Sequence, residues 1–211
     1  MWRPRRPDVL RWDHNARFHP WLLARLPPRV DRALDVGCGT GTLARLLAAQ
    51  AARVDAVDRS DAMIGLARQV PGGDGVTWLV GDVLAIDLPP AAYDVVTAVA
   101  SLHHLPLEAG LERLGSLVRP GGSLVVVGLA RSTSWRDLLL DAVSVVADPV
   151  VGAVLAVRRP RRAQDPVPPL RDPRESFEDV VAAAGRLLPG SEVRRHLFYR
   201  YTLWWTRPST S

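Results

Sequence analysis

One segment, LDVGCGTGT over residues 34–42, restricts the folds open to this chain. It begins at the end of a short apolar run typical of a buried strand, and its three glycines precede a segment of helical periodicity. Glycine lets the backbone turn tightly and approach a ligand, and the N-terminus of the following helix presents N–H groups to the same place. A strand, a glycine loop and a helix in this order are typical of an α/β sheet that binds a ligand where its first strand ends.

The rest of the chain supports a doubly wound α/β sheet, because apolar runs of strand length alternate with segments of helical periodicity. We predict strands over residues 33–36, 53–57, 76–80, 93–99 and 123–128, and helices over residues 42–51, 61–69 and 107–118. The sequence RPGG at residues 119–122 predicts the end of the third of these helices. Towards the C-terminus we predict a helix that opens at Asp172 and ends near Leu187, followed by a hairpin. The two strands of that hairpin are predicted over residues 192–197 and 199–206.

Length and composition suit a single globular domain. The chain has 211 residues, of which 47% are hydrophobic and 23% charged. Its net charge of +5 comes entirely from arginine, since the sequence has no lysine, and this bias is weak evidence for nucleic-acid binding. The single cysteine, Cys38, cannot form an intrachain disulfide, and no apolar run follows the basic residues at the start. We therefore expect a cytoplasmic protein without a signal peptide.

Three carboxylates stand at the ends of the first three predicted strands: Asp35, Asp58 and Asp82. A carboxylate at the second position can accept hydrogen bonds from ribose hydroxyls, and one at the third can accept from an adenine amino group. Each also has a purely structural alternative: Asp35 could tie down its own turn, Asp58 could cap the next helix, and Asp82 could belong to a Gly-Asp turn. Their joint occurrence favours a nucleoside-containing ligand.

The glycine loop argues against a dinucleotide. The dinucleotide fingerprint G-x-G-x-x-G requires glycine at position 42, which is threonine here. Asp35 precedes the first glycine by two residues, where its charge would repel a pyrophosphate and attract a cationic ligand. A nicotinamide-dependent reductase is therefore disfavoured, and a ligand with a sulfonium and an amino group, such as S-adenosylmethionine, is favoured.

Four segments resemble, in order, the successive motifs of class I methyltransferases, particularly the ubiquinone- and menaquinone-type branch. They are LDVGCGTGTLARLLA, VDAVDRSDAMIGLAR, VGDVLAIDLPPAAYDVVTAVASLHHL and LVRPGGSLVVVG, and they span roughly residues 32–129. The resemblance implies a seven-stranded, mostly parallel sheet of order 3-2-1-4-5-7-6 with strand seven antiparallel and helices on both faces. It also implies S-adenosylmethionine as methyl donor, S-adenosylhomocysteine as product, and no metal. The cofactor-binding residues it implies are Asp35, Gly37, Cys38, Gly39, Gly41, Asp58, Arg59, Met63, Asp82, Val83 and Ala98.

The same resemblance divides the single domain into four parts. Residues 1–29 are a cap segment, 30–130 the cofactor-binding core, 131–175 a lid insertion with a Pro/Arg-rich loop, and 176–211 the terminal helix and hairpin. Within the insertion, residues 135–157 predict a helical lid over a hydrophobic acceptor. The alternatives are a helix pair that only covers the sheet, or weak membrane-surface contact with help from residues 158–162. A membrane span is disfavoured, because Asp141 and Asp148 would each cost about 2.5–3.5 kcal/mol near its centre.

The acceptor is expected to be a small, hydrophobic molecule. The motifs place His103 and His104 beside the methyl group, and we name His103 as the acid/base or acceptor-orienting residue, leaning to O-methylation. Methylation at carbon or nitrogen, and a purely structural role of both histidines in their turn, stay open. Trp12, His14 and His19 are further candidates to orient the acceptor, with helix anchoring as the alternative role.

Two other classes remain. Methyltransferases that act on base amines resemble one another in an Asn/Asp-Pro-Pro-aromatic run after strand four, but residues 98–103 read AVASLH here. A small-molecule acceptor is therefore favoured over nucleic acid. The sequence alone does not separate an enzyme from a non-catalytic relative that binds the cofactor, and it leaves the oligomeric state open.

Overall fold

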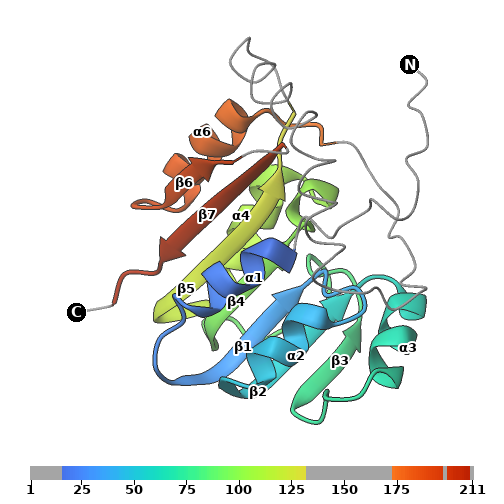
Figure 1. Ribbon diagram of the computed structural model, residues 1–211. Helices are drawn as coiled ribbons and strands as arrows, with labels where there is room; N and C mark the ends of the chain where they lie inside the picture. Colours follow the sequence, from blue (N-terminus) through green and yellow to red (C-terminus); the bar gives the residue numbers. More distant parts are fainter. Residues whose placement is uncertain (1–15, 132–172, 197–198, 210–211) are drawn as a thin grey trace, which may run out of the picture.

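The computed structural model describes residues 16–131, 173–196 and 199–209. Its centre is one seven-stranded sheet of order β3-β2-β1-β4-β5-β7-β6 (Figure 1). Neighbouring strands from β3 to β5 are parallel, and β7 runs antiparallel to both β5 and β6. The predicted order and the antiparallel seventh strand are therefore confirmed. The strands are β1 (Val30–Val36), β2 (Ala51–Asp58), β3 (Val76–Val80), β4 (Tyr93–Val99), β5 (Val118–Leu129), β6 (Glu192–Arg195) and β7 (Arg200–Thr206).

Helices cover both faces of the sheet. On one face, α1 (His19–Leu23) and α2 (Thr42–Ala48) pack their leucines on β1, β2 and β4. On the other face, α4 (Leu107–Leu117) and α6 (Phe177–Leu187) close the larger core. Helix α3 (Asp61–Gln69) packs against β2 and β3 and begins at Asp61 as predicted, with Ser60 as its N-cap. Short 3-10 turns, η2 (Ala16–Phe18) and η3 (Leu102–His104), precede α1 and α4.

Several predicted boundaries are wrong. Strand β1 begins three residues earlier than predicted, and α2 ends at Ala48 instead of residue 51, because β2 already begins at Ala51. Two further errors concern β5 and α6. The RPGG residues do not end a helix. Helix α4 stops before them at Leu117, and β5 begins at Val118 and runs through residues 119–122. Gly122 is required there, because a Cβ would lie 2.8–3.0 Å from three backbone carbonyl oxygens. Helix α6 opens at Ser176 instead of Asp172, since Ser176 and Asp179 form the reciprocal capping box.

The expected lid at residues 135–157 lies outside the described residues, as do Trp12, His14 and residues 158–162. The chain leaves and re-enters the described fold at neighbouring points, because the Arg131 N–H donates to the Glu175 carbonyl at 2.8 Å. Among the described helices, none is long and apolar enough to cross a membrane.

Candidate cofactor and acceptor site

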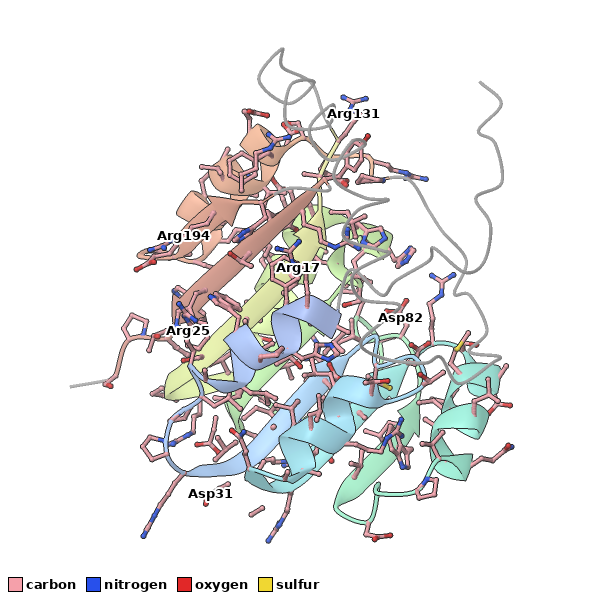
Figure 2. All side chains as sticks on the ribbon, in the orientation of Figure 1. Arg17, Arg25, Asp31, Asp82, Arg131 and Arg194 are labelled. Carbon is pink, nitrogen blue, oxygen red and sulfur yellow. The ribbon has the colours of Figure 1, made fainter. Side chains whose placement is uncertain are left out.

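The carboxyl ends of β1 to β4 meet at one edge of the sheet, where parallel α/β proteins bind ligands. Figure 2 shows Asp82 at this edge and Asp31 at the opposite one. The glycine loop between β1 and α2 turns here, with Gly37, Gly39 and Gly41 all at positive φ. A Cβ on Gly37 would lie 2.3 Å from the Ser101 Cβ, so only glycine fits this loop against the end of β4.

Asp35 lies beneath the loop and is almost completely buried. The Thr97 hydroxyl donates to its Oδ1 at 2.9 Å, while Oδ2 has no hydrogen-bond partner among the described residues. Burial raises the pKa of this carboxyl to about 7, and the nearby Asp58 charge adds to the rise, partly offset by the Thr97 hydrogen bond. A buried carboxylate oxygen without a partner is unfavourable unless a ligand supplies one.

Asp58 ends β2 and organises the backbone around it. Its Oδ2 accepts from the Gly39 N–H and its Oδ1 from the Ser60 N–H, both at 2.9 Å. The carboxylate therefore fixes the glycine loop and the start of α3 at once. A carboxylate has about four acceptor positions, so two remain to accept from hydroxyls of a ligand.

The remaining predicted cofactor residues lie around these two carboxylates or along the same edge. Cys38 is half-buried within the loop, and burial beside Asp35 and Asp58 raises the pKa of its thiol, which stays protonated. Asp82 is exposed and accepts from the Leu84 N–H at 2.9 Å, while Val83 beside it is buried. Arg59 is exposed, Met63 is half-buried in α3, and Ala98 is buried in β4 beside β1.

The chain turns sharply after β4. Ala100 has a left-handed backbone with φ 53°, and the Ser101 hydroxyl donates to the Val36 carbonyl at 2.7 Å. This bond ties the turn to the root of the glycine loop. His103 and His104 follow in η3 with their ring centroids 4.1 Å apart.

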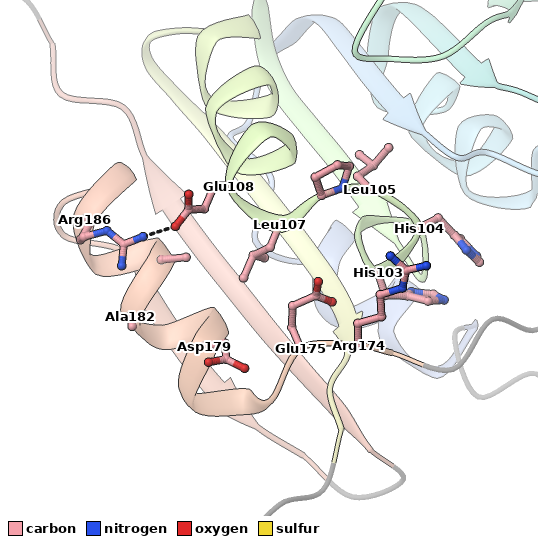
Figure 3. A pocket seen from close by; sticks show the side chains of 12 residues that line it. His103, His104, Leu105, Leu107, Glu108, Arg174, Glu175, Asp179, Ala182 and Arg186 are labelled. Carbon is pink, nitrogen blue, oxygen red and sulfur yellow. Dashed lines mark hydrogen bonds and ion pairs between the residues drawn. The ribbon is translucent and has the colours of Figure 1, made fainter.

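His103 is the most perturbed histidine of the described chain. Burial, and then the charges of His104 and Arg200, lower its pKa to about 4, so its imidazole is neutral at pH 7. Its Nδ1 is buried and has no hydrogen-bond partner among the described residues. Both histidines line a cavity of about 650 Å³ between η3, α4 and α6 (Figure 3). Arg174 and Glu175 point into the same cavity.

His19 takes a different place from the His103–His104 pair. It is buried at the start of α1, on the sheet face that α2 also covers. Its neighbours in the chain anchor the helix: Phe18 meets His196 edge to face at 5.3 Å, and Trp21 meets Trp204 at 6.3 Å.

Sequence reasoning missed two side chains that shape the site, Thr97 and Ser101. Both are buried polar residues in or just after an apolar strand, since Thr97 lies within β4 and Ser101 two residues beyond it, and that contrast was the available signal. Their targets, Asp35 and Val36, are more than sixty positions away in sequence, so the contacts themselves could not be foreseen.

Three features of the site fit a ligand that carries a cation and a ribose. They are the tight glycine loop, the Asp35 oxygen without a hydrogen-bond partner among the described residues, and the two remaining acceptor positions of Asp58. Together with the sheet order 3-2-1-4-5-7-6 they define the class I S-adenosylmethionine-dependent methyltransferases.

Comparison with known proteins agrees. Residues 33–122 match a family model described as a methyltransferase domain. An uncharacterized methyltransferase of Mycobacterium tuberculosis is 33% identical over 198 residues, which cover 93% of this chain and 98% of that protein. A ubiquinone biosynthesis O-methyltransferase of Burkholderia ambifaria is 36% identical over 126 residues, about half of each chain. A solved structure from Pyrococcus horikoshii is 19% identical, with a TM-score of 0.67 over 95% of this chain and 93% of that one. The chain belongs to the methyltransferase family and is an S-adenosylmethionine-dependent enzyme.

Proposed function

We propose that this methyltransferase transfers the methyl group to an oxygen atom of a small acceptor held in the cavity beside His103, which charged as well as apolar side chains line. The observation that carries the proposal is the neutral His103 imidazole, whose buried Nδ1 has no partner among the described residues. The half-length similarity to a ubiquinone biosynthesis O-methyltransferase supports the same choice of atom.

The donor is proposed to lie along the carboxyl edge of β1 to β3. Asp35 would face its cationic methionine end, Asp58 would accept from the ribose hydroxyls, and Asp82 with Val83 would flank the adenine. Gly37, Gly39 and Gly41 allow the loop backbone to approach the donor closely. When bound, the donor would supply the methyl group of its sulfonium, whose bond to sulfur breaks on transfer and leaves S-adenosylhomocysteine.

The role of His103 follows from its lowered pKa. An imidazole with a pKa of about 4 is a weak base, so it orients an acceptor by hydrogen bonding better than it removes a proton. A hydroxyl keeps a lone pair for the methyl group while it donates a hydrogen bond to this imidazole. As the oxygen–methyl bond forms and the sulfur–methyl bond breaks, the hydroxyl proton is released to solvent. A protonated amine has no lone pair until it loses a proton, so the site favours oxygen over nitrogen.

The test is methyl transfer from S-adenosylmethionine carrying a labelled methyl group to matched phenols and benzylamines, with the methylated atom identified by mass spectrometry. Benzylamines are protonated at pH 7.5 and phenols are not charged, so the pairs compare the two kinds of acceptor at similar size. We expect methyl ethers and at least tenfold slower N-methylation. Faster methylation of the amines would contradict the proposed acceptor atom and leave the methyltransferase class intact.

A further inference from the structure

Arg45, on the first turn and a half of α2, bridges two elements of the cofactor site. Its Nη2 donates to the Thr40 carbonyl in the glycine loop at 2.7 Å, and its Nη1 donates to the Ala67 carbonyl in α3 at 3.3 Å. The same peptide unit, between Thr40 and Gly41, is also held through its N–H, because the Gly41 N–H donates to the Cys38 carbonyl at 2.8 Å. One guanidinium therefore fixes the last peptide of the loop relative to the helix that carries Met63.

Trp78, on the edge strand β3, packs its ring against the end of the glycine loop. Its ring packs so tightly on the loop that a Cβ on Gly41 would lie 2.2 Å and 2.4 Å from two ring carbons. A Cβ on Gly73 would lie 3.1 Å from the ring, and the Arg45 guanidinium carbon lies 5.8 Å from the ring centroid. Both side chains are half-buried, and neither belongs to the predicted cofactor residues.

Three glycines at positive φ make a loop that is costly to order, because glycine loses more conformational freedom than any other residue. A loop already ordered before the ligand arrives spares the ligand that cost and binds it more tightly. A planar guanidinium can donate to two carbonyls in different directions, which a lysine ammonium on a flexible stem does less well.

We propose that Arg45 and Trp78 are positioning residues that hold the glycine loop in its donor-binding shape before the donor arrives. The inference rests on the cofactor site described above. It assigns to the two side chains an effect on donor affinity that acts through the loop backbone, without contact with the donor itself.

The variant Arg45→Met tests this, with Arg68→Met as the matched control. Arg68 lies in the last turn of α3 and donates to the backbone carbonyl of Trp78 at 3.1 Å. Its loss removes a guanidinium from the same part of the fold, but no hydrogen bond to the glycine loop and no contact of the Trp78 ring with Gly41. Binding of S-adenosylhomocysteine is measured by calorimetry, and hydrogen exchange of residues 37–44 is measured in ligand-free protein. We expect Arg45→Met to weaken binding about tenfold and to speed exchange in the loop, as loss of hydrogen bonds from a charged group implies. Arg68→Met should stay within about twofold of the parent in binding, with loop exchange unchanged.

Arg45→Lys and Trp78→Phe serve as conservative variants if Arg45→Met fails to fold. Each keeps part of the support, so we expect about threefold weaker binding and a smaller rise in loop exchange. Binding and loop exchange equal to those of Arg68→Met in all variants would overturn the inference. If the parent itself bound no S-adenosylhomocysteine, the cofactor site would be refuted, and the exchange arm alone would decide whether Arg45 and Trp78 order the loop.

Discussion

The Asp35 carboxyl opposes folding when it ionises in the absence of ligand. Its pKa is about 7 in the folded chain against 3.8 for an unperturbed aspartate, so the folded state binds more protons than the unfolded state between these values. The free energy of unfolding therefore falls as pH rises from about 4 to about 7. The penalty is fully present above pH 7 and amounts to roughly 4 kcal/mol.

Asp35→Asn should remove that penalty and weaken donor binding at the same time. At pH 8 we expect the ligand-free variant to be more stable than the parent by urea unfolding, with the difference gone near pH 4. For the parent, binding of S-adenosylmethionine should tighten as pH rises through 7, because the ionised carboxylate favours the cationic ligand. Asp61→Asn, on the exposed first turn of α3, is the control. Parent affinity that does not change between pH 6 and 8 would contradict this role.

His103 should contribute no pH dependence near neutrality, because its imidazole stays neutral above a pKa of about 4. We expect kcat of the parent with a phenol acceptor to show no inflection from this residue between pH 6 and 8. His103→Asn should lower kcat about tenfold at every pH in that range, because the variant loses the orientation of the acceptor but loses no proton-transfer step. An inflection near pH 6.5 that disappears in His103→Asn would instead identify His103 as a general base.

The turn after β4, which places Ser101 against the glycine loop, is strained at Ala100. Ala100 adopts a left-handed conformation that costs an alanine about 1–2 kcal/mol and a glycine almost nothing. Ala100→Gly should therefore raise the free energy of unfolding by about 0.5–1 kcal/mol, after the entropy of a more flexible unfolded chain is subtracted. Ala98→Gly, two residues earlier in the extended, buried part of β4, should lower it by about 1 kcal/mol. Urea unfolding measures both, and an Ala100→Gly variant less stable than the parent would show that the turn is unstrained.

At the level of elements, the sequence predicted what local periodicity determines. Strands β3 and β4 and helix α3 begin and end as expected, because each is bounded by residues that end or cap it: Ser60, Gly75 and Gly81 among them. The errors lie where long-range pairing overrides a local signal. The RPGG residues look like a stop, yet β5 begins before them because Val118 pairs with Tyr93 of β4.

At the level of the whole molecule, the fold was accessible from the motifs, whereas the electrostatics of the site were not, and the list of cofactor residues stays a prediction. Asp35 was expected to be a charge facing a cation, and its raised pKa depends on how completely other segments bury it. The same holds for the contact of Trp78 with Gly41, which joins an edge strand to a loop far from it in sequence.

Calorimetric titration of the parent and of Asp58→Ala with S-adenosylmethionine tests the central claim most directly. In the proposed site the variant would lose the acceptors for two ribose hydroxyls, each about 1.5–3 kcal/mol for a hydrogen bond to a charged group. It also loses the acceptor of the Gly39 N–H. We predict one binding site in the parent, at least about hundredfold weaker binding in Asp58→Ala, and unchanged affinity in the control Asp61→Ala. Equal affinity of the parent and Asp58→Ala would contradict the placement of the donor at the carboxyl edge of this sheet.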